Sequence, residues 1–200
     1  MREEKIAMFQ ETLDAARLGR YTVDGKTVKL TLSPGEMRAV IPLSPEAVAA
    51  ITGKAADRSV PFENGSIDVS VSNKDSFSAA MDMAKNTLSQ SGRRHRVLVL
   101  NFANPVHPGG GVARGATAQE EDLCRKSTLY LSLKSGTANR MYQYNRKQED
   151  YLASDYMLLS PNVEIIRGCD GQLLPETVVV AVLTAAAPMI SRGRLTVSKN

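Results

Sequence analysis

The 200-residue sequence contains only two cysteines, Cys124 and Cys169, and they form no C-x-x-C motif. Two cysteines are too few for a disulfide framework, and no His/Cys spacing suggests a zinc site. No apolar run approaches the roughly 18 residues needed to span a membrane, and the charged start, residues 1–5, lacks the apolar stretch of a signal peptide. We therefore expect a protein of the reducing cytoplasm, or of the nucleus in a eukaryote, with no metal, no cofactor and no membrane partner.

Aromatic residues are scarce as well, at 5% of the chain, and the charge is nearly balanced. Lys and Arg total 25 against 21 Asp and Glu, a net charge of +4 that suits an anionic ligand without requiring nucleic acid. The basic cluster at residues 93–96 has no aromatic side chains interleaved with it for stacking on bases. We interpret it as a solvated loop and regard nucleic acid as the least favoured partner.

With 42% hydrophobic and 23% charged residues, the composition is that of an ordinary globular protein. A chain of this length is expected to fold around one core. We predict a single domain over residues 1–200, in which an N-terminal helix and hairpin (residues 1–64) precede a core that carries the chemistry (residues 65–200).

The first half of the chain predicts helices and short strands. Apolar residues at helical spacing predict a helix over residues 2–18 that Gly19 ends, and Asp24-Gly25 predicts a hairpin whose second strand holds Val28, Leu30 and Leu32. Ser44 and Pro45 are typical of a helix start. Alternation of apolar and polar residues predicts a strand over residues 67–71, and a 3.6-residue period over residues 77–88 predicts a helix that Gly92 closes.

Three further strands are expected in the second half. Residues 97–103 and 177–183 are nearly all apolar, which favours central strands covered on both faces, and residues 163–166 predict a third. The small residues from Thr184 to Pro188 predict a loop. Strands alternating with helices indicate an α/β fold with a mixed sheet, in which ligands bind past the carboxyl ends of the strands.

Three successive glycines, Gly109 to Gly111, follow the first of these strands. Glycines adopt conformations closed to other residues, so their N–H groups can converge on an anion near a helix start. The segment lacks the Lys-Ser/Thr of a P-loop and the spacing of a dinucleotide-binding motif. Without further context, a phosphate cradle and a flexible glycine turn remain equally open.

Two adjacent glutamates begin the helix predicted after the glycines. Thr117 and Glu120 have the spacing of a capping box, which gives Glu120 a structural role. Glu121 lies about 100° around the helix from Glu120, so only one of the two carboxylates is expected to transfer a proton. A charged helix start is the simpler interpretation of either residue alone. Cys124 has no base beside it, and we expect a buried cysteine rather than a nucleophile.

The run NFAN, then GGG, VARGATA and QEE, over residues 101–121, resembles the signature of microbial-type poly(ADP-ribose) glycohydrolases in the macrodomain superfamily. Similarity extends from the first helix to the small-residue loop at residues 184–188. The resemblance implies a macrodomain-like mixed sheet flanked by helices. It also implies hydrolysis of ribose–ribose O-glycosidic bonds in poly(ADP-ribose), which releases ADP-ribose.

The resemblance also assigns roles to residues. Glu121 would be the catalytic acid/base and Glu120 would position the ribose that Asn104 contacts, while the glycines bend around the diphosphate and residues 184–188 form a second phosphate loop. No cofactor is implied. The residues expected in the site are Glu120 and Glu121 (catalytic) and Asn104, Gly109, Gly110, Gly111, Gln119, Thr184, Ala185, Ala186 and Ala187 (ligand-binding).

Members of that family usually continue beyond the position that matches Asn200, with a loop that closes over the adenosine. We therefore expect a fold that is incomplete at the C-terminus, through truncation or cleavage, natural shortening, or completion by a second chain. Two functions follow as alternatives: a glycohydrolase that acts on poly(ADP-ribose), and a module that binds ADP-ribose without hydrolysing it.

Overall fold

The computed structural model describes residues 1–56, 69–91, 97–148 and 153–186. Within these ranges the strands form a four-stranded sheet of order β3-β5-β6-β4 and a separate two-stranded sheet, β1-β2. The helices are α1 (Arg2–Leu18), α2 (Pro34–Met37), α3 (Pro45–Ala56), α4 (Ser76–Ser91), the 3-10 helix η1 (Val112–Arg114), α5 (Gln119–Lys126), α6 (Leu129–Leu133) and α7 (Asn139–Arg146). The strands are β1 (Arg20–Val23), β2 (Lys26–Lys29), β3 (Ile41–Leu43), β4 (Leu98–Ala103), β5 (Met157–Arg167) and β6 (Leu173–Ala186).

The N-terminal helix and hairpin form as predicted. Gly19 ends α1 in the left-handed conformation (φ 65°), and β1 pairs antiparallel with β2. The second strand is shorter than predicted, because β2 ends at Lys29. Beyond it the backbone N–H of Leu32 donates to the buried Glu164 carboxylate of β5 (3.1 Å), so the chain leaves the hairpin there and joins the main sheet.

The main sheet is mixed. β4 runs parallel to β6, whereas β5 pairs antiparallel with both β6 and β3. β6 therefore lies between β4 and β5, and the carboxyl ends of β4 and β6 meet at one end of the sheet. The α/β class with a mixed sheet flanked by helices is confirmed.

β4 does not have the two covered faces that its apolar sequence predicts. Val99, Asn101 and Ala103 are buried, whereas Leu98 is 57% exposed and Phe102 is 59% exposed. β4 has only β6 as a neighbour in the described part of the chain, and the described helices leave its outward-facing side chains in contact with solvent.

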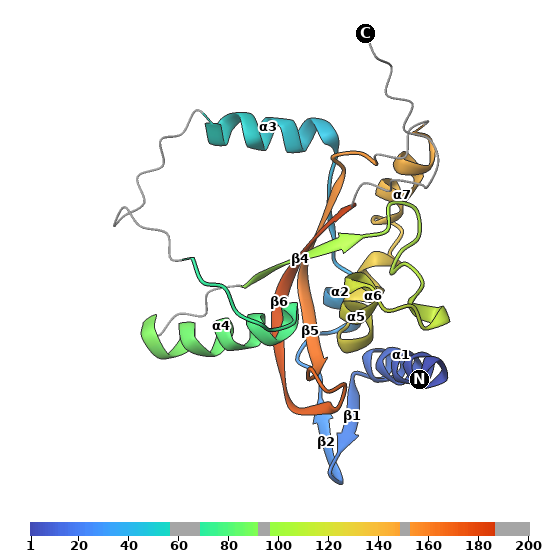
Figure 1. Cartoon of the computed structure of the whole chain (residues 1–200), viewed down its shortest axis with the longest axis vertical. Coiled ribbons are helices and arrows are strands. Elements are labelled where there is room, and N and C mark those ends of the chain that lie inside the picture. Colours follow the sequence, from blue (N-terminus) through green and yellow to red (C-terminus); the bar gives the residue numbers. More distant parts are fainter. Residues whose placement is uncertain (57–68, 92–96, 149–152, 187–200) are drawn as a thin grey trace.

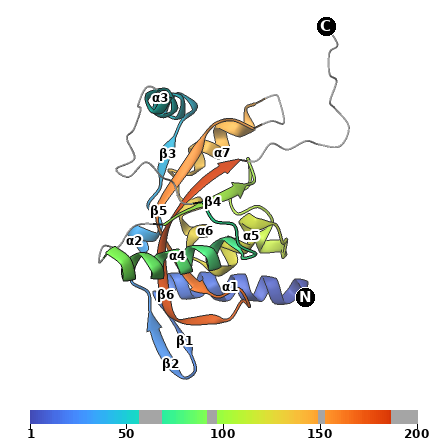
Figure 2. The same ribbon diagram turned by 60° about the vertical axis from the view of Figure 1, so that its left-hand side comes forward.

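The helices lie on both sides of the main sheet. Figure 1 shows α1, α5, α6 and α7 on one side and α3 and α4 on the other, and Figure 2 shows α4 in front of the sheet with α1 behind it. The larger core cluster joins α1, α5, α6 and α7 to the sheet through residues such as Phe9, Leu123, Leu129 and Tyr142. None of the helices in the described ranges is long and apolar enough to cross a membrane.

The predicted strand over residues 67–71 is wrong for the part that the structure describes. Residues 69–71 form no strand, and Val69 is 85% and Val71 97% exposed. An alternating pattern becomes a strand only where a neighbouring strand accepts its hydrogen bonds, and the described residues supply none there. Residues 67 and 68, Gly92 and the basic cluster at residues 93–96 lie outside the described residues.

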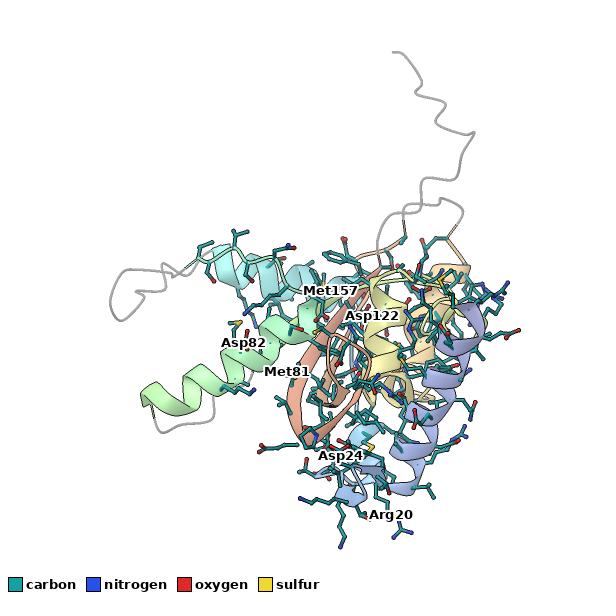
Figure 3. All side chains as sticks on the ribbon, turned by 60° about the horizontal axis from the view of Figure 1, so that its bottom comes forward. Arg20, Asp24, Met81, Asp82, Asp122 and Met157 are labelled. Atoms are coloured by element: carbon teal, nitrogen blue, oxygen red, sulfur yellow. The ribbon has the colours of Figure 1, made fainter. Side chains whose placement is uncertain are left out.

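The hairpin and the start of α5 occupy different regions of the molecule. Figure 3 shows Arg20 and Asp24 of the hairpin at one end, and Asp122 in the first turn of α5 well away from them. A change in the hairpin can therefore test the stability of the fold without touching residues near α5.

Candidate active site

The loop that carries the candidate site connects β4 to α5, at the carboxyl end of the parallel strands. It begins after Ala103, contains η1, and is fixed by α7. The Asn145 side chain donates to the carbonyl of Pro105 (2.9 Å), and Arg146 donates to the carbonyl of Val106 (2.8 Å). The site therefore lies where open α/β sheets bind ligands, on a loop anchored to a helix.

The Glu120 side chain is 2% exposed and turns back from α5 into this loop. Its Oε2 accepts the backbone N–H of Asn104 (2.8 Å) and its Oε1 accepts that of Gly109 (3.1 Å). Burial raises the pKa of Glu120 to about 7, although the two amides and the Asn101 side chain oppose the rise; the Glu121 charge adds to it. Glu120 can therefore carry a proton near neutral pH.

The Glu121 carboxylate lies beside the next part of the loop and is 7% exposed. Its Oε1 accepts the N–H of Gly111 (2.8 Å). Its Oε2 is buried and has no hydrogen-bond partner among the described residues. A buried carboxylate oxygen without a partner is costly, so this oxygen is available for a hydrogen bond with a ligand.

The glycines hold the glutamates, which corrects the expected phosphate cradle. The N–H groups of Gly109 and Gly111 donate to Glu120 and Glu121, and that of Gly110 donates to the carbonyl of His107 (2.9 Å). Because all three amides have partners within the protein, they do not form an open anion site.

The absence of a side chain at Gly110 lets the two carboxylates approach the loop. A Cβ built on Gly110 would collide with Oε1 of Glu121 and lie 3.2 Å from Oε2 of Glu120. Gly110 also has a φ of +55°, which other residues rarely adopt. The site therefore depends on glycine at this position for both space and backbone conformation.

Asn104 lies beside Glu120, whose Oε2 accepts its backbone N–H, and the predicted contact with the ribose stays a prediction. Its side-chain Oδ1 accepts the N–H groups of Val106 (3.0 Å) and His107 (2.9 Å), which folds the loop back on itself. This leaves the Asn104 amide nitrogen as the group of the side chain that can donate to a ligand.

Gln119 was expected to contact the ligand, but its side chain covers the edge of β4. It accepts the N–H of Phe102 (2.8 Å) and donates to the carbonyl of Leu100 (2.8 Å) and to the Ser76 hydroxyl (3.1 Å). An amide side chain can replace a neighbouring strand in this way, which blocks part of an open edge. Gln119 thus joins β4 to α4.

The predicted capping box is absent. The N-cap of α5 is Ala118, which makes no side-chain cap, and the Glu120 carboxylate accepts the N–H groups of Asn104 and Gly109 instead of an N–H at the helix start. The Glu120 carboxylate binds amides of the loop in preference to the N–H groups at the start of α5. Capping spacing alone cannot reveal this, because Asn104 and Gly109 are distant in sequence from the helix start.

Residues 184–186 were predicted in a loop but form the end of β6. Thr184, Ala185 and Ala186 pair with Asn101, Phe102 and Ala103 in the parallel register. Small side chains do not prevent strand pairing when a neighbouring strand, here β4, supplies the backbone partners. Thr184 is buried and its hydroxyl accepts the Asn101 side-chain amide (3.2 Å). Ala187 lies outside the described residues.

Two buried polar residues near the glutamates escaped the sequence analysis. Asn101, a single amide within an apolar strand, interacts with Glu120 and has an unpartnered Oδ1 among the described residues. Tyr142 of α7 is fully buried with an unpartnered hydroxyl, and burial followed by the Glu120 charge raises its pKa. The isolated polar residue in the strand was the available signal for Asn101; nothing comparable marks Tyr142.

Cys124 is fully buried, as predicted. Burial, with a smaller effect from the neighbouring carboxylates, raises the pKa of its thiol well above the usual value, which disfavours a nucleophilic thiolate. Within the described ranges, no group of three or more His, Cys, Asp or Glu side chains could hold a metal ion. The chemistry that this arrangement supports is proton transfer by carboxyl groups.

Comparisons with known proteins place this site in a family. Residues 9–168 match the family model described as microbial-type PARG, catalytic domain. The chain is similar to the poly(ADP-ribose) glycohydrolase from Thermomonospora curvata bound to the inhibitor ADP-HPD (32% identity, TM-score 0.78), covering 94% of this chain and 64% of that one. It is also similar to the Deinococcus radiodurans enzyme in complex with ADP-ribose (35% identity, TM-score 0.67), covering 80% of this chain and 59% of that one.

The chain thus spans less than two thirds of the length of these solved relatives. No curated protein matches it at a significant level. The family match covers residues 9–168, which include the loop and both glutamates. The chain therefore belongs to the family of microbial-type poly(ADP-ribose) glycohydrolase catalytic domains.

Proposed function

We propose that this chain hydrolyses ribose–ribose O-glycosidic bonds in poly(ADP-ribose) and releases ADP-ribose. The observation that carries the proposal is the pair of adjacent buried carboxylates, Glu120 and Glu121, which loop amides hold at the carboxyl end of β4. Family membership and the ADP-ribose and ADP-HPD complexes of the relatives support this substrate class.

Glu121 is assigned the acid/base role because it has the unpartnered oxygen. Cleavage requires a proton for the departing hydroxyl, and charge builds up on an oxocarbenium-like sugar as the bond breaks. In the proposed reaction, Oε2 of Glu121 donates that proton as the glycosidic C–O bond breaks. The resulting carboxylate then removes a proton from water as the water oxygen bonds to the anomeric carbon, which restores the acid.

Glu120 is assigned to positioning of the ribose, together with Asn104. Both carboxyl oxygens of Glu120 accept loop amides, which fixes its orientation. The raised pKa of Glu120 means that the two adjacent carboxyl groups need not both be charged in one buried site. The Asn104 amide nitrogen supplies a donor for a sugar hydroxyl.

The diphosphate is not assigned to the N–H groups of Gly109 and Gly111, because the glutamates accept both. We propose that it binds near residues 184–186 at the end of β6, within the segment that the family resemblance implies. The orienting effect of a bound diphosphate on the scissile bond still applies there, since positioning contributes to the rate whichever donors supply it.

The alternative is a module that binds ADP-ribose without hydrolysing it. One experiment separates the two: the 200-residue chain is incubated with poly(ADP-ribose) while release of ADP-ribose is recorded, and binding of free ADP-ribose is measured by calorimetry. Release and binding together support the glycohydrolase. Binding without release favours the alternative, and absence of both refutes the proposed substrate class.

A second chain that completes the fold, and a cytoplasmic location, stay predictions. Exposed apolar side chains on one side of the sheet support the prediction of a second chain that covers this side. They are Leu98, Leu100 and Phe102 of β4 and Ile41 of β3.

A further inference from the structure

The backbone of Gly109 rests on an aromatic ring. A Cβ built on Gly109 would lie 2.7 Å from Cδ2 and 2.8 Å from Cε2 of Tyr130, well inside van der Waals contact. Tyr130 belongs to α6 and is partly buried against the main core. The contact involves the side of the ring, so the ring and not the hydroxyl supports the glycine.

The Tyr130 ring is itself held from α1. Phe9 packs against it edge to face, with the ring centroids 4.9 Å apart and the planes at 88°. Phe9 is 4% exposed and lies in the same core cluster. Edge-to-face pairs favour one relative orientation of the rings, so Phe9 restricts where Tyr130 can lie.

Gly109 is the residue through which this packing reaches the carboxylates. Its N–H donates to Oε1 of Glu120 (3.1 Å), while Oε2 of Glu120 accepts the N–H of Asn104 (2.8 Å). The Asn104 end of the loop is held by α7 through Pro105 and Val106. The two hydrogen bonds to Glu120 therefore have separate supports: α7 for one and the Phe9–Tyr130 pair for the other.

We propose that Tyr130 is a positioning residue for Glu120: its ring, oriented by Phe9, holds the Gly109 backbone so that the Gly109 N–H points at Oε1 of Glu120. Through Phe9, α1 thereby contributes to the positioning of Glu120. The effect on catalysis rests on the proposed function, but the effect on the hydrogen bond does not.

The first test reads the two hydrogen bonds separately by NMR. Exchange of the Gly109 and Asn104 amide protons is measured, together with the change of their chemical shifts as Glu120 titrates. In Tyr130→Leu, exchange at Gly109 is expected to accelerate by roughly tenfold relative to Asn104. The Gly109 shift should also lose at least about half of its response to Glu120, since the hydrogen bond transmits that response.

The comparison of two amides in one molecule separates positioning from general instability. A lower global stability speeds exchange at both amides, whereas loss of the ring should affect Gly109 selectively. The titratable groups that interact with Glu120 are Glu121 and Cys124 on α5 and Tyr142 on α7, and none of them is changed.

Three variants serve as controls. Tyr130→Phe keeps the ring and should retain the wild-type behaviour at Gly109. Tyr21→Leu removes a buried tyrosine ring from the smaller core cluster beneath the hairpin and should leave the ratio of the two exchange rates unchanged. Phe9→Leu should shift the ratio in the same direction as Tyr130→Leu but less, and it replaces that variant if Tyr130→Leu does not fold.

A double-mutant cycle tests the contact directly. Gly109→Ala is strained by its φ of +69° in any background, but its collision with the ring disappears in Tyr130→Leu. Gly109→Ala should raise the equilibrium constant for unfolding in both backgrounds. The factor of increase should be roughly tenfold smaller in the Tyr130→Leu background, as expected for residues in contact.

The proposal is overturned if Gly109 and Asn104 respond equally to Tyr130→Leu, or if Gly109→Ala has the same effect in both backgrounds. These readouts need no substrate. A chain that shows the selective Gly109 response but releases no ADP-ribose would refute the proposed function and leave the role of Tyr130 intact.

Discussion

At the scale of single residues, the unusual feature is that two carboxylates are buried next to each other and share a loop of glycines. Glu120 and Glu121 are 2% and 7% exposed, although both lie in the first turn of α5, where a solvated charge would be ordinary. Backbone N–H groups compensate three of the four carboxyl oxygens. The fourth, Oε2 of Glu121, is the oxygen for which we propose a substrate.

The raised pKa of Glu120 predicts a pH dependence of stability. Burial raises this pKa from its ordinary value of 4.5 to about 7, so ionisation is harder in the folded state than in the unfolded chain. The contribution of Glu120 to folding is therefore greatest below about pH 4.5, falls as the pH rises toward about 7, and then levels off. Between about pH 4.5 and pH 7, the contribution of Glu120 to the free energy of unfolding falls by about 3 kcal/mol.

Urea unfolding measured from pH 4 to pH 8 checks this dependence. The difference in unfolding free energy between wild type and Glu120→Gln should decrease across the window, because the neutral glutamine does not titrate. A difference that stays constant with pH would show that Glu120 keeps an ordinary pKa.

Gly110 gives a second prediction at this scale. A side chain there meets Glu121 and must adopt a φ of +55°, so Gly110→Val should lower the unfolding free energy by about 2 kcal/mol or more and displace Glu121. Thermal unfolding and ADP-ribose calorimetry measure the two effects. Gly136, which has open space around its Cβ position, offers a matched control in Gly136→Val. Equal stability of the Gly110 variant and the wild type would refute the packing described for the loop.

The sequence predicted which residues gather in this site better than it predicted what they do there. The order Asn104, glycine triplet and glutamate pair located the loop, because the motif is local in sequence. The partners of the glycine amides could not be predicted, since an N–H group serves an anion or a carboxylate equally well. Only the fold decides that α5 turns its glutamates back into the loop.

At the scale of elements, the N-terminal segment is joined to the main sheet by one buried carboxylate. Glu164 of β5 is fully buried and accepts the N–H and hydroxyl of Thr31, the N–H of Leu32 and the hydroxyl of Thr177. These four donors attach the chain that follows the hairpin to β5 and β6. The hairpin segment is thus held by hydrogen bonds as well as by its small apolar cluster.

Removal of this carboxylate should be strongly destabilising. Glu164→Ala leaves two backbone N–H groups and two hydroxyls, all partly buried in these contacts, without their acceptor, and we expect a loss of about 3 kcal/mol in unfolding free energy. Glu164→Gln keeps one acceptor oxygen and should lose less. Denaturant unfolding of both variants tests the order; a Glu164→Ala protein as stable as wild type would contradict the role given to this residue.

The elements show why some strands were predictable and others were not. The predicted strands at residues 163–166 and 177–183 form within the main sheet, as parts of the longer strands β5 and β6. Residues 69–71 have the correct alternation but no neighbouring strand, and residues 184–186 have poor strand composition but a partner in β4. Pairing is a property of the whole sheet, so a local pattern fails wherever the partner determines the result.

At the scale of the whole molecule, one side of the sheet exposes apolar side chains. Leu98, Leu100 and Phe102 alternate along β4 with exposed fractions of 57%, 42% and 59%. In the described part of the chain, the helices leave this row in contact with solvent. Such a row favours association with other apolar surfaces.

Polar substitution of this row should reduce association without loss of the fold. Phe102→Ser is expected to change the unfolding free energy by less than about 1 kcal/mol, because its side chain is mostly exposed. It should also lower the weight-average mass at high protein concentration, measured by analytical ultracentrifugation. Val99→Ser, on the buried side of the same strand, should instead destabilise the fold. If Phe102→Ser unfolds as readily as Val99→Ser, the exposed assignment of Phe102 is wrong.

The most direct measurement compares wild type, Glu121→Gln and Asp122→Asn for release of ADP-ribose from poly(ADP-ribose), with ADP-ribose affinity measured in parallel. Asp122 is the matched control: it follows Glu121 in the same helix turn but pairs with Lys126 (2.8 Å). Glu121→Gln should slow release by roughly 10²-fold or more while it retains ADP-ribose affinity, and Asp122→Asn should stay near wild type. Unchanged release by Glu121→Gln would contradict the assignment of Glu121 as the acid/base.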